Sequence, residues 1–210
     1  MTTSRIPGAP FDAVLCDFDN VIRFYDPSRL AELERRAGLA EGTTAQLAFA
    51  PERDLPLLLG EITKRQWVES IVLGLTGRVP QAQARELGTA FAEAPFRADE
   101  AVVALLRRVR AHMPLVLVTN ATEELEADLV SLGLADLAHH VVSSARVGVA
   151  KPDRRIYEIA AERAGVGVNR CLFVDDRAEN VEAAVALGMT GVHYREPDDL
   201  RAVLGFLPPG

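Results

Sequence analysis

Short apolar runs alternate with helix-like segments along most of this chain. The runs lie at residues 13–16, 115–118, 171–174 and 191–194, with a weaker one at 141–142. Runs this short and this uniformly apolar are typical of strands that are buried on both faces of a sheet. Helical periodicity fills the intervals between the later runs, at residues 122–133, 153–165 and 178–188. The alternation predicts an α/β fold with a Rossmann-like parallel sheet and right-handed crossovers.

The segment after the first run differs, because residues 25–95 carry helical signals only. Thr63 and Gln66 have the spacing of a capping box, and Pro80 begins another amphipathic segment. An insertion at this point would stand above the carboxyl ends of the strands, where open parallel sheets bind ligands. We therefore predict a core and an inserted α-helical cap that acts as a lid. The core is residues 11–23 and 95–210, and the cap is residues 24–94.

Composition excludes some classes of function. The formal charge of −7 argues against a nucleic-acid backbone as partner. No apolar run reaches the length of a membrane span, and no secretory signal is visible at the N-terminus. The two cysteines, Cys16 and Cys171, fall inside predicted strands, as buried thiols of a cytoplasmic protein would. We expect a frayed C-terminal tail at residues 207–210, and the oligomeric state stays open.

Polar residues follow three of the apolar runs, and one lysine precedes a predicted helix. They are Asp17 and Asp19, Thr119 and Asn120, Lys151, and Asp175 and Asp176. In a parallel sheet these points converge at one edge, although they are far apart in the sequence. Carboxylates together with an ammonium, a hydroxyl and an amide can bind a hard cation and a phosphoryl group. The pattern predicts a site of that kind.

The order of these residues resembles the four motifs of the haloacid dehalogenase superfamily. The resemblance covers the chain from about Phe11 to Tyr194, and the helical block is similar to the small cap of the dehalogenase-like and phosphoglycolate-phosphatase-like branch. It implies that Asp17 attacks phosphorus and forms an aspartyl phosphate. Asp19 would protonate the leaving oxygen and then deprotonate the hydrolytic water.

The resemblance also implies a cofactor and its ligands. Mg²⁺ would bind the Asp17 and Asp176 carboxylates and the Asp19 backbone carbonyl, with Asp175 acting directly or through water. Lys151 would offset the negative charge of the site, and Thr119 and Asn120 would donate hydrogen bonds to phosphoryl oxygens. The partner implied is a small phosphorylated molecule.

Three positions near the first motif bear on specificity. Many members of the superfamily carry glycine where this chain has Asn20, and asparagine tolerates the positive φ of a tight turn. Asn20 would then place an amide near the substrate. Arg23 and Phe24 lie where the cap begins, and their side chains are candidates to face the substrate.

The pair His139 and His140 lacks a third ligand at a suitable spacing, so we interpret both as surface residues.

Three other functions compete with a phosphatase. A 2-haloacid dehalogenase uses the same nucleophile on carbon without a metal, but an acid at Asp19 suits an alkoxide leaving group, which a halide does not require. A phosphomutase would pass the phosphoryl group to a second hydroxyl. A non-catalytic binding protein should have lost a nucleophile or a metal ligand, and this sequence retains both.

Overall fold

Five parallel strands form the sheet that carries the four motifs. The computed structural model describes residues 8–208. The strands are β1 (Ala13–Cys16), β4 (Leu115–Thr119), β5 (His140–Ser143), β6 (Cys171–Asp175) and β7 (Thr190–His193). Their order across the sheet is β5-β4-β1-β6-β7, so β1 lies at the centre between β4 and β6. This confirms the predicted α/β fold with a parallel sheet.

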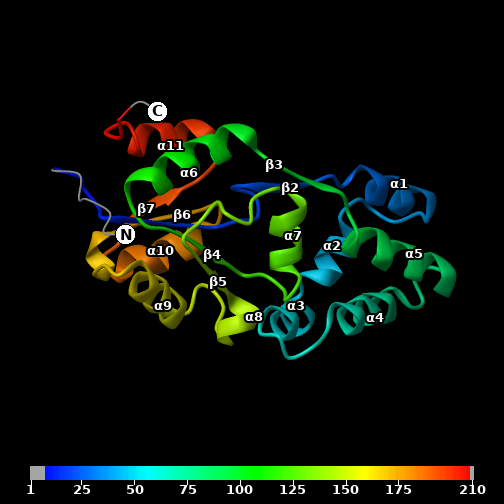
Figure 1. The fold of residues 1–210 in the computed structure, drawn as a ribbon. Coiled ribbons are helices and arrows are strands. Elements are labelled where there is room, and N and C mark those ends of the chain that lie inside the picture. Colours follow the sequence, from blue (N-terminus) through cyan, green and yellow to red (C-terminus); the bar gives the residue numbers. More distant parts are fainter. Residues whose placement is uncertain (1–7, 209–210) are drawn as a thin grey trace. The chain divides into compact units, whose positions relative to one another are not determined.

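Helices cover both faces of this sheet (Figure 1). Alternate residues of the central strands point to opposite faces, so Val14 packs into one buried cluster and Leu15 into the other. The cluster around Val14 includes helices α6 (Glu100–His112), α7 (Leu125–Ser131) and α11 (Pro197–Val203). The cluster around Leu15 includes α9 (Arg154–Ala164) and α10 (Ala178–Ala186). The short helices are α8 (Ser144–Val147) and the 3-10 helix η1 (Val168–Arg170).

Two of these helices have an aspartate at the N-cap position. Asp99 accepts hydrogen bonds from the backbone N–H groups of Ala101 and Val102 at the start of α6. Asp153 accepts one from Arg155 at the start of α9, which ends at Gly165 with φ of 70°. A left-handed residue at a helix C-terminus favours glycine, so these ends follow directly from the residue types.

The helical block forms a separate compact unit, Tyr25–Arg97, and the rest of the chain forms the other. Its helices are α1 (Ser28–Arg36), α2 (Thr43–Ala48), α3 (Pro51–Leu58), α4 (Lys64–Leu75) and α5 (Gln81–Ala92). The predicted capping box is confirmed, because Thr63 and Gln66 exchange side-chain and backbone hydrogen bonds at the start of α4. Trp67 is buried in the core of this unit.

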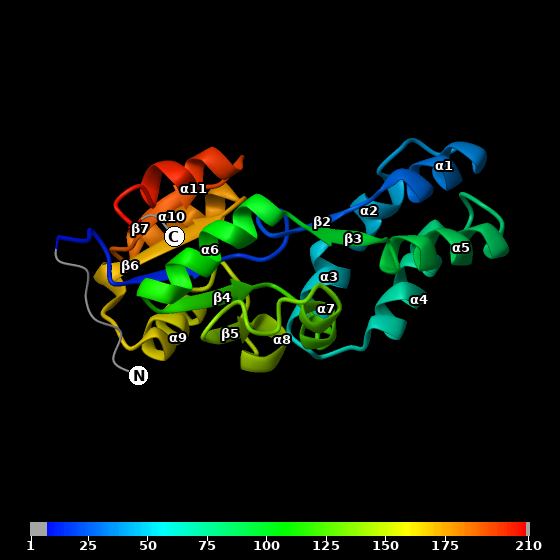
Figure 2. The ribbon, with the colours of Figure 1, turned by 45° about the horizontal axis from the view of Figure 1, so that its top comes forward.

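The prediction that the block is wholly helical is wrong at its two ends. Strands β2 (Arg23–Tyr25) and β3 (Phe96–Ala98) pair with each other there, and both are visible in Figure 2. The Tyr25 and Phe96 rings meet edge to face at 5.7 Å. Asp26 N–H donates to the carbonyl of Pro95 at 2.7 Å. Three-residue strands are too short to show an alternating pattern, so they could not be predicted from sequence periodicity.

The C-terminal region also differs from the expectation. Helix α11 had not been predicted, and a capping box between Glu196 and Asp199 begins it. The expected frayed tail is wrong for Leu207 and Pro208, since Leu207 is buried and both carbonyls accept hydrogen bonds from Arg108. Residues 209–210 lie outside the described part, as do residues 1–7 of the N-terminal segment.

Helix α7 begins later than expected, at Leu125 rather than residue 122. The preceding loop is tied to the end of β5 instead. Ala121 N–H donates to Ser144 Oγ at 3.1 Å, and the Ala121 carbonyl accepts from Ser143 and Ser144. Side-chain hydroxyls that bind backbone groups compete with helix formation, which is consistent with the later start of α7.

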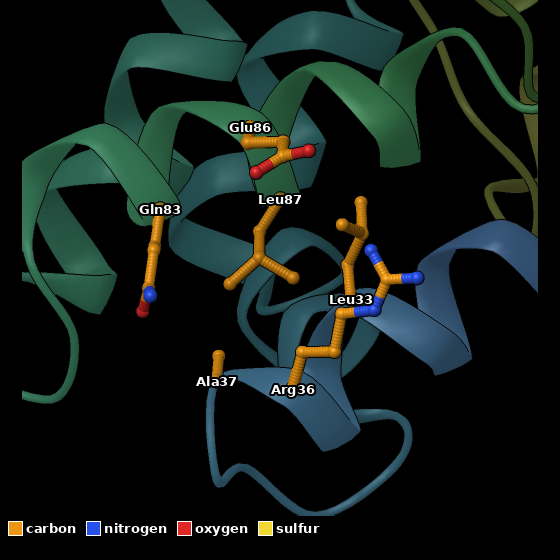
Figure 3. A pocket seen from close by; sticks show the side chains of 6 residues that line it. All are labelled: Leu33, Arg36, Ala37, Gln83, Glu86 and Leu87. Atoms are coloured by element: carbon orange, nitrogen blue, oxygen red, sulfur yellow. The ribbon is translucent and has the colours of Figure 1, made fainter.

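Two further observations concern the described residues 8–208. No helix among them is both long enough and apolar enough to cross a membrane. Within the helical unit, a cavity lies between α1 and α5, and Figure 3 shows its lining. The lining residues are Leu33, Arg36, Ala37, Gln83, Glu86 and Leu87. None of them belongs to the four motifs.

Candidate functional site

The four motifs meet at the carboxyl edge of the sheet because of the strand order. Asp17 directly follows β1, Thr119 ends β4, and Asp175 ends β6. Since β1 pairs with both β4 and β6, these three positions lie on adjacent strands. Lys151 comes from the turn between α8 and α9. The predicted convergence is therefore present in the structure.

Lys151 links the first and last motifs. Its Nζ lies 2.8 Å from Asp17 Oδ1 and 2.6 Å from Asp175 Oδ2. The lysine side chain is 1% exposed, and those of Asp17 and Asp175 are 8% and 0% exposed. Buried charges are tolerated when they are paired and hydrogen-bonded. The single ammonium thus holds two buried carboxylates that would otherwise repel each other.

The Asp175 carboxylate has its hydrogen bonds satisfied from several directions. Asn180 Nδ2 donates to Oδ1 at 3.0 Å and lies 3.1 Å from Oδ2. The backbone N–H of Arg177 donates to Oδ1 at 2.9 Å. Together with Lys151, these contacts fix the orientation of Asp175. Asn180 is in turn held by Tyr157, whose hydroxyl donates to the Asn180 carbonyl at 3.0 Å.

Three carboxylates of this edge fit a hard cation. One oxygen from each of Asp17, Asp175 and Asp176 can be chosen so that all three lie within 4.8 Å of one another. Asp176 is more exposed than Asp175, and its Oδ2 accepts a hydrogen bond from Asn20 Nδ2 at 3.1 Å. An all-oxygen donor set of this charge suits Mg²⁺. His193 Nε2 lies 2.9 Å from the Asp176 carbonyl and supports this loop.

Thr119 offers an unused hydrogen-bond donor beside this cluster. Its Oγ1 is buried and has no hydrogen-bond partner within residues 8–208. Buried hydroxyls normally have a partner, and leaving one unpaired costs about 1–3 kcal/mol. A hydroxyl in this state at the edge where the carboxylates gather fits the recognition of a phosphoryl oxygen.

Asn120 contacts the backbone of Lys151, which the sequence did not predict. Its Nδ2 donates to the carbonyl of Lys151 at 3.0 Å, and its Oδ1 accepts from the Lys151 N–H at 2.7 Å. Both polar ends of the side chain bind the backbone of Lys151, and the expected hydrogen bond to a phosphoryl oxygen stays a prediction. Asn120 therefore fixes the turn that delivers the lysine.

The turn after β1 places Asp19, Asn20 and Arg23 together. Asn20 has φ of 59°, in the left-handed region that asparagine tolerates. The Asp19 carboxylate accepts two hydrogen bonds from Arg23, from Nε at 2.6 Å and from NH2 at 3.0 Å. Its carboxylate thus faces a guanidinium, and it is not one of the three carboxylates that converge.

Burial controls the charge states of this cluster. Burial raises the pKa of Asp17 to about 7, against the lowering effect of Lys151, while Asp175 and Asp19 add to the rise. Burial also raises the pKa of Asp176. For Lys151, burial alone would lower the pKa, but the Asp17 and Asp175 carboxylates outweigh it and raise the pKa. The lysine is therefore charged across the physiological range.

The raised pKa of Asp17 predicts a pH-dependent stability. Ionising Asp17 disfavours the folded state, because its pKa is higher in the folded than in the unfolded chain. The stability that this shift contributes is therefore fully present below the ordinary pKa of 3.8 and is lost as the pH rises to about 7. The wild type should lose about 1.4 kcal/mol per pH unit relative to Asp17→Asn over this window. Urea unfolding of both proteins in chelator, from about pH 5 to about pH 8, measures the difference. Parallel curves would contradict the assignment.

The comparisons with known proteins agree with this geometry. The family of haloacid dehalogenase-like hydrolases matches residues 11–188. The chain belongs to this family. A phosphatase from Mycobacterium tuberculosis, MT3486, is 31% identical over 192 residues, which cover 84% of each chain. The hydrolase class predicted from the motifs is thereby confirmed.

Two solved structures of this family share the fold. One is an enzyme from Bacteroides thetaiotaomicron in complex with magnesium and inorganic phosphate, with a TM-score of 0.65 and 20% identity. The match covers 86% of this chain and 92% of that one. The other is an L-2-haloacid dehalogenase from Xanthobacter autotrophicus with chloropropionic acid covalently bound, with a TM-score of 0.62 and 20% identity. That match covers 95% of this chain and 85% of the other.

Sequence reasoning missed several residues that build the site. Asn180 is not among the predicted site residues, although a buried polar residue on the helix that follows β6 is a signal that could have marked it. His193, at the end of β7, carried no distinguishing pattern. Asp128 contacts Arg23 across a sequence separation of 105 residues, which no local pattern can reveal. The predicted surface position of His139 and His140 is confirmed, because both are exposed.

Proposed function

We propose that this hydrolase is a Mg²⁺-dependent phosphatase that hydrolyses a small phosphomonoester through an aspartyl phosphate on Asp17. The observation that carries the proposal is Lys151, which bridges Asp17 and Asp175 beside Asp176. A phosphoryl group brings negative charge into a cluster of carboxylates, and a buried ammonium at its centre offsets that charge. The names of the M. tuberculosis phosphatase and of the B. thetaiotaomicron complex support this function.

In the first step, Asp17 attacks phosphorus in line with the ester oxygen. Both donors to its carboxylate, Phe18 N–H and Lys151 Nζ, bind Oδ1 among the described residues, which leaves Oδ2 to attack. The new bond joins Asp17 to phosphorus, and the bond from phosphorus to the ester oxygen breaks. Asp19 gives its proton to the departing oxygen. Thr119 Oγ1 donates to a phosphoryl oxygen as charge develops.

In the second step, water attacks the phosphorus of the aspartyl phosphate. Asp19, now ionised, takes a proton from this water, and the bond from phosphorus to Asp17 breaks to release phosphate. Lys151 stabilises the Asp17 carboxylate as it reforms. Asp175 keeps Lys151 in place throughout, while Asn120 holds the backbone of the lysine.

A bound Mg²⁺ would be held by the carboxylates of Asp17 and Asp176 and by the Asp19 backbone carbonyl, with Asp175 nearby. When bound, the ion supplies positive charge that orients the phosphoryl group and stabilises the transition state. Because the Asp175 carboxylate already accepts from Lys151, Asn180 and Arg177, we propose that it acts through water. Asn20 would then orient Asp176 through its amide.

Asp19 favours a phosphatase over a 2-haloacid dehalogenase, although dehalogenases share the fold. A proton donor is useful for an alkoxide leaving group and unnecessary for a halide. A phosphomutase would use the same first step and a second hydroxyl in place of water. Since Asp17, Lys151 and Asp176 are all present, a purely binding function explains less of the site than catalysis does.

The unit Tyr25–Arg97 is proposed to act as the cap that selects the substrate. It contains none of the four motifs, and its own core is separate from the two clusters of the sheet. Substrate choice and chemistry would therefore depend on different parts of the chain. A cytoplasmic location is part of the proposal and is supported by the two buried free cysteines, Cys16 and Cys171.

Removal of metal tests the proposed function. Hydrolysis of 4-nitrophenyl phosphate should fall to background in excess chelator and return when Mg²⁺ is restored, because Lys151 alone does not offset the charge of three carboxylates and a phosphate. Asp176→Asn should raise the Mg²⁺ concentration needed for half-maximal rate by about tenfold or more. Asp198→Asn, at an exposed position of α11, is the control. Undiminished turnover in chelator would contradict the proposed dependence on Mg²⁺.

A further inference from the structure

Arg23 is buried among groups that leave little of its guanidinium for substrate. Its side chain is 5% exposed, and Nε and NH2 bind the two oxygens of Asp19. NH1 lies 2.5 Å from Asp128 Oδ2. The guanidinium carbon lies 4.7 Å from the centre of the Phe18 ring, a cation–π distance. Each nitrogen of the guanidinium therefore has a carboxylate contact.

Asp128 anchors this arrangement from a separate element. It lies on α7, the helix that follows the second motif, and its side chain is 27% exposed. The buried residues Leu125 and Leu129 of the same helix pack into the core of the sheet. Because α7 is fixed by that packing, the Asp128 contact fixes the far side of the guanidinium relative to the catalytic edge.

A bidentate contact fixes the plane of the Asp19 carboxylate and leaves lone pairs of both oxygens available for proton transfer. Two parallel N–H···O bonds set the orientation of both oxygens. An ionised carboxylate has about four lone-pair positions, so each oxygen retains one for a proton from water. General acid–base catalysis needs a carboxyl group within hydrogen-bond reach of the oxygen that gains or loses the proton. The contact is thus of the kind that positions an acid–base group.

We propose that Arg23, anchored by Asp128, is a positioning residue for Asp19 and not a ligand of the phosphoryl group. The inference rests on the proposed phosphatase activity and replaces the expectation that Arg23 contacts the substrate. It assigns a functional role to Asp128 as well. The role acts only through proton transfer, so its effect depends on how much the leaving group needs a proton.

The test is a series of phosphate monoesters, from 4-nitrophenyl phosphate to alkyl phosphates, with Arg23→Gln, Arg23→Lys and Asp128→Asn. Arg23→Gln should lower kcat/KM about tenfold or more for alkyl esters and less than about threefold for the nitrophenyl ester. Arg23→Lys should show most of the same loss of kcat/KM, again larger for alkyl esters than for the nitrophenyl ester, because an ammonium cannot form the bidentate contact. Asp128→Asn should show the same selectivity with a smaller loss.

Inhibition by inorganic phosphate separates positioning from substrate binding. The inhibition constant should stay within about twofold of wild type in all three variants, since no phosphate contact is removed. Glu126→Gln and Arg146→Gln are matched controls, because they break an exposed ion pair between helix α7 and helix α8 and should leave the turnover of every ester unchanged. Thermal unfolding identifies any variant that fails to fold.

Two results would overturn the positioning role. One is an equal loss for all leaving groups, and the other is a weakening of phosphate inhibition by about tenfold in Arg23→Gln. If neither Arg23 variant folds, Asp128→Asn provides the test, because Asp128 is partly exposed. An unchanged dependence of kcat/KM on the leaving group in that variant would contradict the proposed role of Asp128 in anchoring Arg23. A wild type that hydrolyses none of the esters would instead remove the proposed function itself.

Discussion

Asp17→Asn is expected to lower kcat for 4-nitrophenyl phosphate by at least about 10⁴-fold, because the attacking oxygen is replaced by an amide. Asparagine has nearly the same size and shape as aspartate, so it should fit the buried position beside Lys151 and folding should be retained. The raised pKa of Asp17 indicates that the variant will be at least as stable as wild type in chelator at about pH 8.

The control for this variant is the exposed Asp198→Asn, which changes the net charge equally and should keep full activity. Circular dichroism and thermal unfolding of both proteins show whether the fold is intact. A folded Asp17→Asn with more than about one tenth of wild-type turnover would exclude Asp17 as the nucleophile.

Lys151→Met should have the second largest effect, because it removes the one charge that two buried carboxylates share. We expect a loss of about 10³-fold in kcat/KM and of about 3–5 kcal/mol in the free energy of unfolding at neutral pH. Both losses have one cause: Asp17 and Asp175 stay buried beside each other without a counter-ion. Steady-state kinetics and urea unfolding measure the two effects.

Lys64→Met, a change at the other lysine of the chain, is the matched control and should be silent in both measurements. Double substitution separates the two roles of Lys151. Adding Asp175→Asn to Lys151→Met should recover part of the lost stability, since one buried charge is removed, without recovering activity. Additive losses of stability in the double variant would contradict the shared pairing.

The sheet and the position of the motifs could be predicted because the signals are local. Strands buried on both faces are uninterrupted apolar runs, and a parallel sheet brings the residues that follow them to one edge. Asp17, Thr119 and Asp175 therefore lie together as expected. The helical content of the inserted block followed from capping residues such as Thr63 and Gln66.

The remaining features depend on contacts that sequence spacing does not encode. The paired strands β2 and β3 are three residues each, and they are fixed by each other. Asn120 binds the Lys151 backbone 31 residues away. Residue type limits what a side chain can bind, but only the packed structure decides which of several partners it meets. For that reason the role that we propose for Arg23 differs from the expected one, while its place beside the first motif is as expected.

Covalent phosphoryl transfer to Asp17 can be tested by trapping the phosphorylated enzyme during turnover. Wild type mixed rapidly with a phosphate ester and Mg²⁺, quenched in acid and digested, should yield the peptide containing Asp17 with one added phosphoryl group. The label should be absent in Asp17→Asn and should disappear as turnover completes. Turnover without a phosphorylated peptide, or an ester on Asp17 formed from a 2-haloacid without metal, would contradict the proposed phosphatase mechanism.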